Sequence, residues 1–192
     1  MENLRLAWTD DFGFAGAYAG PESERVIAVA REAAGSFRQL GAAVEPTQEV
    51  WEDWWPHTVR MAAAAGVSHE QYQAAEDARQ RCWEKLRRTF QSHDLLVSTT
   101  IQHIAFGVER WSAAWSSGGP DFPNGSFVPT WTAHTFLHNW LGWPAVSVPC
   151  GFVDGLPVGL QITGPPNDEP LVLRAAAAYL RASGSGQRPP GV

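Results

Sequence analysis

The feature that most constrains the fold is the alternation of strand-like and helix-like segments along the chain. It is clearest in the last third, where Ala145–Cys150 and Val158–Thr163 each alternate in the way that half-buried strands do. Asp154-Gly155 between them is a turn pair, and a helix is predicted over about 167–181. Because strands that alternate with helices pack as a sheet covered by helices, the pattern predicts an α/β fold.

The first two thirds of the chain carry further segments of both kinds. Strands are predicted at Leu4–Trp8, from Val44, and at Asp94–Thr99. Helices are predicted from Pro21 to a stop at Gly41, over Glu49–Ala65, from Ser68, and over Thr130–Leu141. These segments keep strands and helices in turn along the chain, and they therefore extend the same α/β interpretation toward the N-terminus.

The helix that starts after Ser68 shows the most local detail. Ser68 and Gln71 are spaced as a capping box. Asp77–Arg81 and Glu84–Arg88 have the i,i+4 spacing of ion pairs on one helix. The predicted apolar stripe consists of Tyr72, Ala75, Cys82, Leu86 and Phe90. This segment is therefore predicted to be an amphipathic helix with one buried face.

Composition limits the class of protein. The 192 residues, 44% of them hydrophobic, suit a single domain over 1–182 with a solvated tail at 183–192. The net charge of -6 argues against a nucleic-acid partner, and we see no apolar run long enough for a membrane span and no signal peptide. Cys82 and Cys150 lie too far apart for a disulfide framework or a four-cysteine zinc site. We expect a cytoplasmic protein with no metal, cofactor or membrane partner.

The segment Ser116-Ser117-Gly118-Gly119 looks like a serine-glycine active-site loop. A serine nucleophile needs a nearby base and backbone donors for the oxyanion that forms. No base lies nearby in sequence, so a plain glycine-serine loop is the favoured interpretation.

The histidines and the lysine are weaker candidates for chemistry. His134 and His138 stand four apart on a predicted helix and could meet one metal, but no third ligand is evident, which favours a structural pair. Lys85 is the lysine of the chain, and it lies between charged residues on an amphipathic helix, where a solvated role is expected. A catalytic lysine would need burial or a charged partner to lower its pKa.

Tryptophans gather in residues 106–143, which comprise a loop region and the helix predicted after it. They could be ordinary core residues, or they could line an apolar binding cleft. The residues concerned are Trp111, Trp115, Trp131, Trp140 and Trp143.

The run from His138 to Leu180 carries a more specific signal. Its matching pieces are Asn139, Gly142, Pro144-Ala145, Ser147, Pro149-Cys150-Gly151, the run Gly155-Leu156-Pro157-Val158-Gly159-Leu160-Gln161, and Gly164. In order and spacing this set resembles the C-terminal signature of the amidase signature family. The strand at Leu4–Trp8, the helix that ends near Leu40 and the strand at Asp94–Thr99 resemble the family more weakly.

The resemblance implies the C-terminal part of an amidase signature fold, which is a partial mixed sheet covered by helices. Family members hydrolyse or transfer at carboxamide C–N bonds with two serines and a lysine. All three precede the equivalent of Met1, so we expect the catalytic residues to lie outside this chain. Under this interpretation the Ser116-Ser117-Gly118-Gly119 loop and Lys85 are out of place. The isoleucine at position 101, where many relatives carry proline, is a departure from the family pattern.

The resulting hypothesis is a portion of an amidase that supplies sheet and one wall of the substrate cleft. The wall residues are predicted to be Phe136, Asn139 and Trp143, which lie before and within the matching motif. A small-molecule amide would be the substrate once an N-terminal segment completes the site. Without that segment, self-association is expected. The alternatives are a non-catalytic remnant or binding module and, last, an amidotransferase component of the same family.

Overall fold

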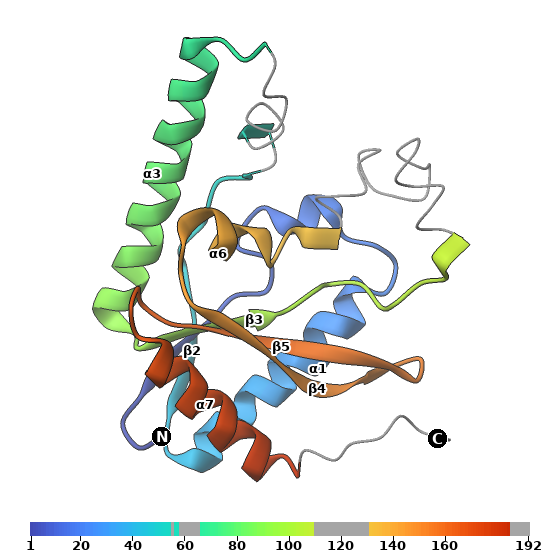
Figure 1. The fold of residues 1–192 in the computed structure, drawn as a ribbon. Helices are drawn as coiled ribbons and strands as arrows, with labels where there is room; N and C mark the ends of the chain where they lie inside the picture. The colour runs from blue at the N-terminus through green and yellow to red at the C-terminus, as the bar shows by residue number, and fades with distance from the viewer. Residues whose placement is uncertain (55, 58–65, 110–130, 185–192) are drawn as a thin grey trace.

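A computed structural model describes residues 1–54, 56–57, 66–109 and 131–184. The described residues form a five-stranded sheet in the order β2-β1-β3-β5-β4 (Figure 1). The strands are β1 (Arg5–Trp8), β2 (Ala43–Pro46), β3 (Leu95–Thr99), β4 (Ala145–Val153) and β5 (Leu156–Thr163). β1 runs parallel to both β2 and β3, whereas β5 runs antiparallel to β3 and β4. The predicted mixed α/β sheet is therefore confirmed.

Helices cover both faces of this sheet (Figure 1). On one face lie α1 (Ser23–Gly35) and α7 (Glu169–Ala182), which contact strands of the sheet that include β4 and β5. On the other face lie α3 (His69–Ser92) and α6 (Phe136–Leu141). Two short 3₁₀ helices, η1 (Ala15–Tyr18) and η2 (Ser36–Leu40), precede and follow α1. The sheet is thus the middle layer of three.

Strand alternation divides the buried side chains into two cores. Val158, Leu160 and Ile162 of β5 pack in the first core, against α1 and α7. Gly159, Gln161 and Thr163 point to the opposite face, as the sequence pattern predicts. The second core lies under α3 and α6 and includes Phe12, Trp51, Trp54, Cys82, Leu86, Leu96, Leu137 and Trp143.

The hairpin of β4 and β5 closes at the predicted turn. Asp154 and Gly155 have φ values of 52° and 76°. A two-residue type I′ hairpin turn requires positive φ at both central residues, and this pair meets that requirement. The prediction that β4 ends at Cys150 was wrong, because the strand continues to Val153 through a register shift between Pro149 and Gly151. β4 is an edge strand of the described sheet, and an edge strand tolerates a proline that cannot donate on its open side.

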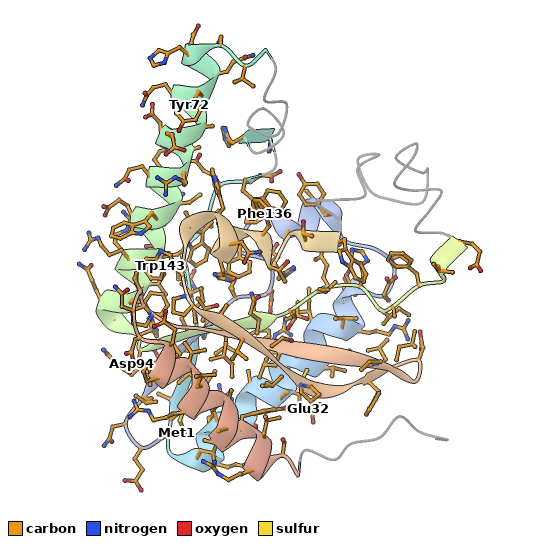
Figure 2. The ribbon with its side chains drawn as sticks, in the orientation of Figure 1. Met1, Glu32, Tyr72, Asp94, Phe136 and Trp143 are labelled. Carbon is orange, nitrogen blue, oxygen red and sulfur yellow. The ribbon has the colours of Figure 1, made fainter. Side chains whose placement is uncertain are left out.

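The capping box that starts α3 is confirmed by two hydrogen bonds. The Gln71 amide donates to Ser68 Oγ at 3.2 Å, and the Ser68 amide donates to Gln71 Oε1 at 3.0 Å. The predicted buried stripe was wrong at Tyr72, which is 50% exposed. Figure 2 shows the reason: the first turns of α3, where Tyr72 lies, extend beyond the sheet.

The two predicted i,i+4 ion pairs within α3 do not form. Arg81 instead contacts Glu52 at 2.6 Å, and Arg88 contacts Glu49 at 3.4 Å. Lys85 Nζ donates to the Val50 carbonyl oxygen at 2.6 Å. Three contacts therefore tie residues 49–52 to α3. The predicted helix over 49–65 was wrong for 49–54, which take no helical structure. Residues 56–57 are helical, and 55 and 58–65 lie outside the described residues.

The remaining expectations concern the ends of helices and of the chain. The helix after Pro21 ends as α1 at Gly35 and continues as η2 until Gly41, whose φ of 83° suits the predicted stop. α7 ends at Ala182, and most of the predicted tail lies outside the described residues. Among the helices that the structure describes, none combines the length and apolar character needed to cross a membrane.

Candidate substrate-cleft wall

α6 positions the residues that the sequence predicts to line a cleft. The helix spans Phe136–Leu141, shorter than the predicted 130–141, and ends where Gly142 adopts a φ of 72°. Phe136 and Asn139 lie one turn apart on it, and Trp143 follows the terminating glycine. Figure 2 shows Phe136 on the upper side of α6 and Trp143 toward α3.

Phe136 is half-buried against the segment that precedes α3. Its ring centroid lies 4.5 Å from that of Trp54, which is itself 1% exposed. Trp54 Nε1 also donates to the Ala133 carbonyl oxygen at 3.2 Å. The Phe136 ring is thus held on one side by the buried Trp54 indole, which is itself hydrogen-bonded just before the start of α6. Part of the Phe136 ring stays accessible.

Trp143 and Asn139 have very different surroundings. Trp143 is 5% exposed, and its ring lies 5.1 Å from Phe90 and 5.8 Å from Trp83 of α3. Asn139 is exposed. The structure therefore does not bring all three predicted wall residues to one surface. Trp143 is buried against α3, whereas Phe136 and Asn139 lie one turn apart on α6 and are half-buried and exposed.

The tryptophans predicted to gather around one cleft contact separate parts of the described chain. Trp131 packs edge-on against Phe106 at 5.0 Å, and Trp140 stacks on His57 at 6.4 Å. Trp111 and Trp115 lie outside the described residues. Trp131, Trp140 and Trp143 thus each pack against a different part of the chain: Phe106, His57 and α3, respectively.

A pair of hydroxyls that sequence reasoning missed lies at the rim of the sheet, on the face that α6 covers. Thr100 Oγ1 is 2.6 Å from Ser147 Oγ, and the pair is exposed. Gly159 lies beneath them: a Cβ there would stand 2.8 Å from the Thr100 hydroxyl oxygen and 2.7 Å from that of Ser147. The absence of a side chain at Gly159 therefore leaves room for these two hydroxyls. A glycine at this strand position is the sequence signal for such a close approach, because residue 159 lies on the sheet face that α6 covers.

The face of β4 beside these hydroxyls is uncovered. Paired residues of antiparallel strands share a face, so Ala145, Ser147 and Pro149 lie on the same side as Thr163, Gln161 and Gly159. Gln161 and Thr163 are buried, whereas all three β4 residues are exposed. Among the described residues, β4 pairs with β5 alone. This edge and its outer face are therefore open to another segment.

His134 and His138 are buried in the second core. Nε2 of His134 donates to the Asp10 carbonyl oxygen at 3.1 Å, and Nε2 of His138 lies 3.3 Å from Thr163 Oγ1. Burial lowers the pKa of His134 to about 4 and that of His138 to about 3. Both imidazoles are therefore neutral near pH 7, and they act as polar core residues under α6.

The two histidines do not converge on a metal. The Phe12 ring lies 5.6 Å from each imidazole, in an edge-on arrangement with both. Within the described ranges no group of three His, Cys, Asp or Glu side chains is placed to hold a metal ion. The pair thus belongs to an aromatic cluster around Phe12, which agrees with its structural interpretation.

The other candidates for nucleophilic chemistry have structural contacts. Lys85 is held by the Val50 carbonyl. Burial raises the pKa of the Cys82 thiol, and it raises that of Cys150 to about 12, so neither is a ready thiolate. Ser92 Oγ lies 3.0 Å from Nδ1 of its neighbour His93 at the end of α3, so this serine contacts a histidine at a helix end. The Ser116-Ser117-Gly118-Gly119 loop lies outside the described residues.

The comparisons with known proteins point to one family. The family model for amidases matches residues 29–173. The acylamidase of Rhodococcus erythropolis is 26% identical over 210 residues, which cover 93% of this chain and 42% of that protein. A glutamyl-tRNA(Gln) amidotransferase subunit of Methanosarcina acetivorans is 36% identical over 118 residues, covering 62% of this chain and 23% of that protein. The chain thus spans less than half the length of these relatives.

Solved structures share the fold. A bacterial aryl acylamidase of the amidase signature family matches with a TM-score of 0.76 at 23% identity, covering 95% of this chain and 44% of that one. The 6-aminohexanoate cyclic dimer hydrolase complexed with substrate matches with a TM-score of 0.71 at 21% identity, covering 98% of this chain and 47% of that one. At this identity the likeness shows the fold alone.

Proposed function

This chain belongs to the amidase family, and we propose that it forms the C-terminal portion of an amidase signature hydrolase that cleaves carboxamide C–N bonds. The observation that carries the proposal is the family match over residues 29–173, together with the open face that β4 presents beside α6. The chain would contribute part of the sheet and one wall of the substrate cleft. The catalytic serines and lysine would come from a segment on the other side of that cleft.

The proposed wall runs from Phe136 to the hydroxyls of Thr100 and Ser147. The accessible part of the Phe136 ring offers apolar surface to an acyl or aryl group. Asn139 and the two hydroxyls can donate and accept hydrogen bonds, as an amide substrate requires. Trp143 would stand behind this wall and hold α6 against α3. In the reaction, water is added across the C–N bond to give a carboxylic acid and an amine.

The contacts of Lys85 support the view that this chain supplies the wall and not the nucleophile. Its ammonium group stays exposed and donates to a backbone carbonyl, whereas serine-lysine chemistry needs a lysine with a lowered pKa beside the serine. We therefore expect no amide hydrolysis by the chain alone. Release of coloured 4-nitroaniline from 4-nitroacetanilide measures this directly. Turnover that Ser117→Ala or Lys85→Ala abolishes would contradict the proposal.

Reconstitution tests the positive half of the proposal. The chain would be coexpressed with the part of the Rhodococcus erythropolis acylamidase that precedes its match to this chain. We expect 4-nitroaniline release by the pair and none by either part. In the active pair, Asn139→Ala and Phe136→Ala should raise KM or lower kcat, whereas His69→Ala, at the exposed start of α3, should change neither. A folded but inactive pair would favour a non-catalytic remnant or binding module.

A component of an amidotransferase is the second candidate. The observation in its favour is the 36% identity to the Methanosarcina acetivorans protein, which is higher than the identity to the acylamidase but covers less of this chain. The net charge of -6 argues against it, because a partner that carries tRNA would be attracted by basic surface. Amide transfer to glutamyl-tRNA(Gln) by the reconstituted pair, without hydrolysis of 4-nitroacetanilide, would support this alternative.

A further inference from the structure

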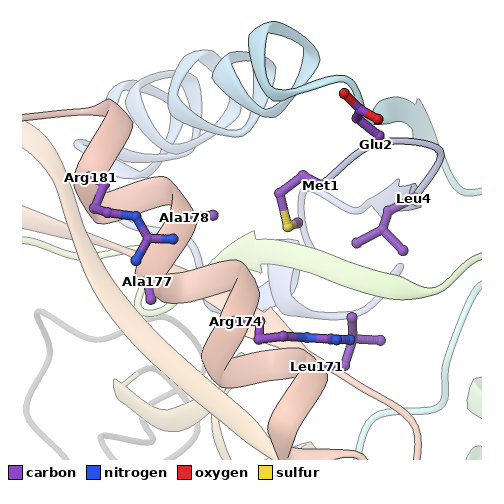
Figure 3. Close-up of a pocket in the computed structure, with 8 residues that line it drawn as sticks. All are labelled: Met1, Glu2, Leu4, Leu171, Arg174, Ala177, Ala178 and Arg181. Carbon is purple, nitrogen blue, oxygen red and sulfur yellow. The ribbon is translucent and has the colours of Figure 1, made fainter.

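A cavity of about 430 Å³ lies between α7 and the first residues of the chain. It is on the α1 and α7 side of the sheet, so the sheet separates it from α6 and the proposed substrate wall (Figure 1). Figure 3 shows the residues that line it: Met1, Glu2, Leu4, Leu171, Arg174, Ala177, Ala178 and Arg181. Its volume falls within the usual range of small-molecule pockets, roughly 300–1,000 Å³.

One part of this cavity is apolar. Leu171 is 7% exposed and belongs to the first core, and Leu4 and Met1 pack against that core. Ala177 and Ala178 present small side chains on the next turns of α7, and they leave the space open. A short hydrocarbon chain could therefore lie along α7 and bury its surface, at about 25 cal/mol for each Å² removed from water.

The other part of the cavity is positively charged. Arg174 and Arg181 are exposed and seven residues apart on α7, so their Cα atoms stand about 10 Å apart along one side of the helix. Figure 3 shows both side chains extending from α7 at the cavity. Glu2 is the acidic residue in the lining, which leaves an excess of positive charge on a protein whose net charge is -6.

These two arginines differ from the other arginines in the described ranges. The others each have a partner: Arg5, Arg25, Arg31, Arg79, Arg81, Arg87 and Arg88 contact carboxylates, and Arg38 donates to the Val44 carbonyl. Arg174 and Arg181 contact no carboxylate or carbonyl of the described chain. The described arginines that are left unpaired therefore both line one cavity.

We propose that this cavity binds an amphipathic organic carboxylate, with its head group on Arg174 and Arg181 and its apolar tail between Leu4 and α7. The planar guanidinium group has a fork of donors that matches a carboxylate in two parallel hydrogen bonds. An apolar tail matches the leucine and alanine wall. The proposal is independent of amide hydrolysis, because the site lies across the sheet from α6.

Titration calorimetry with sodium hexanoate tests this proposal. We expect saturable binding by hexanoate, weaker binding by acetate, which lacks the tail, and none by hexan-1-ol, which lacks the charge. Arg174→Ala and Arg181→Ala should each weaken hexanoate binding by about tenfold, the loss expected for a hydrogen bond to a charged group. Both side chains are exposed and unpaired, so these variants should keep the fold, which circular dichroism checks.

Matched variants separate this site from general charge effects. Arg79→Ala removes a surface arginine of α3 that lies outside the cavity, and it should leave hexanoate binding unchanged. Glu2→Gln removes the opposing carboxylate and should strengthen binding about twofold to threefold. Ala178→Phe fills the apolar part and should weaken hexanoate more than acetate. The proposal would be overturned if the Arg174→Ala/Arg181→Ala double variant bound hexanoate as tightly as the unaltered chain does. It would also be overturned if the unaltered chain bound no hexanoate, or if it bound hexyl phosphate more tightly than hexanoate.

Discussion

The buried histidines make the stability of this protein depend on pH between 5 and 7. In the unfolded chain a histidine has a pKa near 6.5, and burial lowers it to about 4 at His134 and about 3 at His138. His138 shows why protonation is unfavourable, since its Nδ1 is buried without a hydrogen-bond partner in the described structure. A proton placed there would leave a buried charge with no acceptor, in contact with the Phe12 ring.

The direction of the effect follows from the two pKa values. Because the folded pKa lies below the unfolded one, the unfolded chain takes up protons first as the pH falls. The stability is therefore complete above pH 6.5 and is lost progressively as the pH falls toward 4. At 1.36 kcal/mol for each pH unit below 6.5, lowering the pH from 7 to 5 should cost about 2 kcal/mol for each histidine. The sum of about 4 kcal/mol is a large part of a typical stability of ~5–15 kcal/mol.

Urea denaturation followed by tryptophan fluorescence measures this loss at a fixed protein concentration. The double variant His134→Gln/His138→Gln keeps a side chain that can donate to the Asp10 carbonyl and to Thr163. Between pH 7 and 5, its free energy of unfolding should fall by about 4 kcal/mol less than that of the unaltered chain. His69→Gln, at an exposed position, should retain the full pH dependence. An unchanged slope in the double variant would refute the assignment to these two histidines.

Two further predictions concern packing and association. Trp143→Ala should lower the free energy of unfolding by about 3–5 kcal/mol, because it removes a buried indole between Phe90 and Trp83; unchanged stability with a raised KM in the reconstituted pair would show instead that the indole reaches the substrate. The chain alone should self-associate through the open β4 edge; for an exposed apolar face of roughly 500 Å², reburial at ~25 cal/mol/Å² would offer about 12 kcal/mol. Light scattering at several concentrations, with and without the N-terminal segment, measures this, and a monomer indifferent to the segment would contradict it.

The parts of the fold that could be predicted are those that a few neighbouring residues determine. Asp154-Gly155 specifies its turn, and Ser68 with Gln71 specifies the start of α3. The ion pairs could not be assigned in this way. Arg81 has acceptors both at Asp77 on its own helix and at Glu52, which is distant in sequence, and only tertiary packing selects Glu52.

The candidate site was predictable to a smaller extent. The residue pattern predicted a helix over Thr130–Leu141, the resemblance singled out Phe136 and Asn139 within it, and the structure places both on α6. The Thr100–Ser147 contact joins residues 47 apart, and no local pattern links two such hydroxyls. The surroundings of Trp143 were equally hidden, because an indole has the same pattern in sequence whether it faces α3 or a cleft. The turn at Gly142 determines which way the Trp143 indole faces, because it directs the chain back toward α3.

The two kinds of pairing in the sheet also imply an order of folding. The hairpin of β4 and β5 joins neighbouring segments such as Ala145 and Thr163, and hairpins form within about 1–10 μs. The parallel pairing of Leu6 with Leu95 must first bring together distant parts of the chain, which has a greater entropic cost. We therefore expect β1 to dock late, onto a nucleus of hairpin and α7. In pulse-labelling hydrogen exchange, the amides of β5 should then gain protection before those of β1.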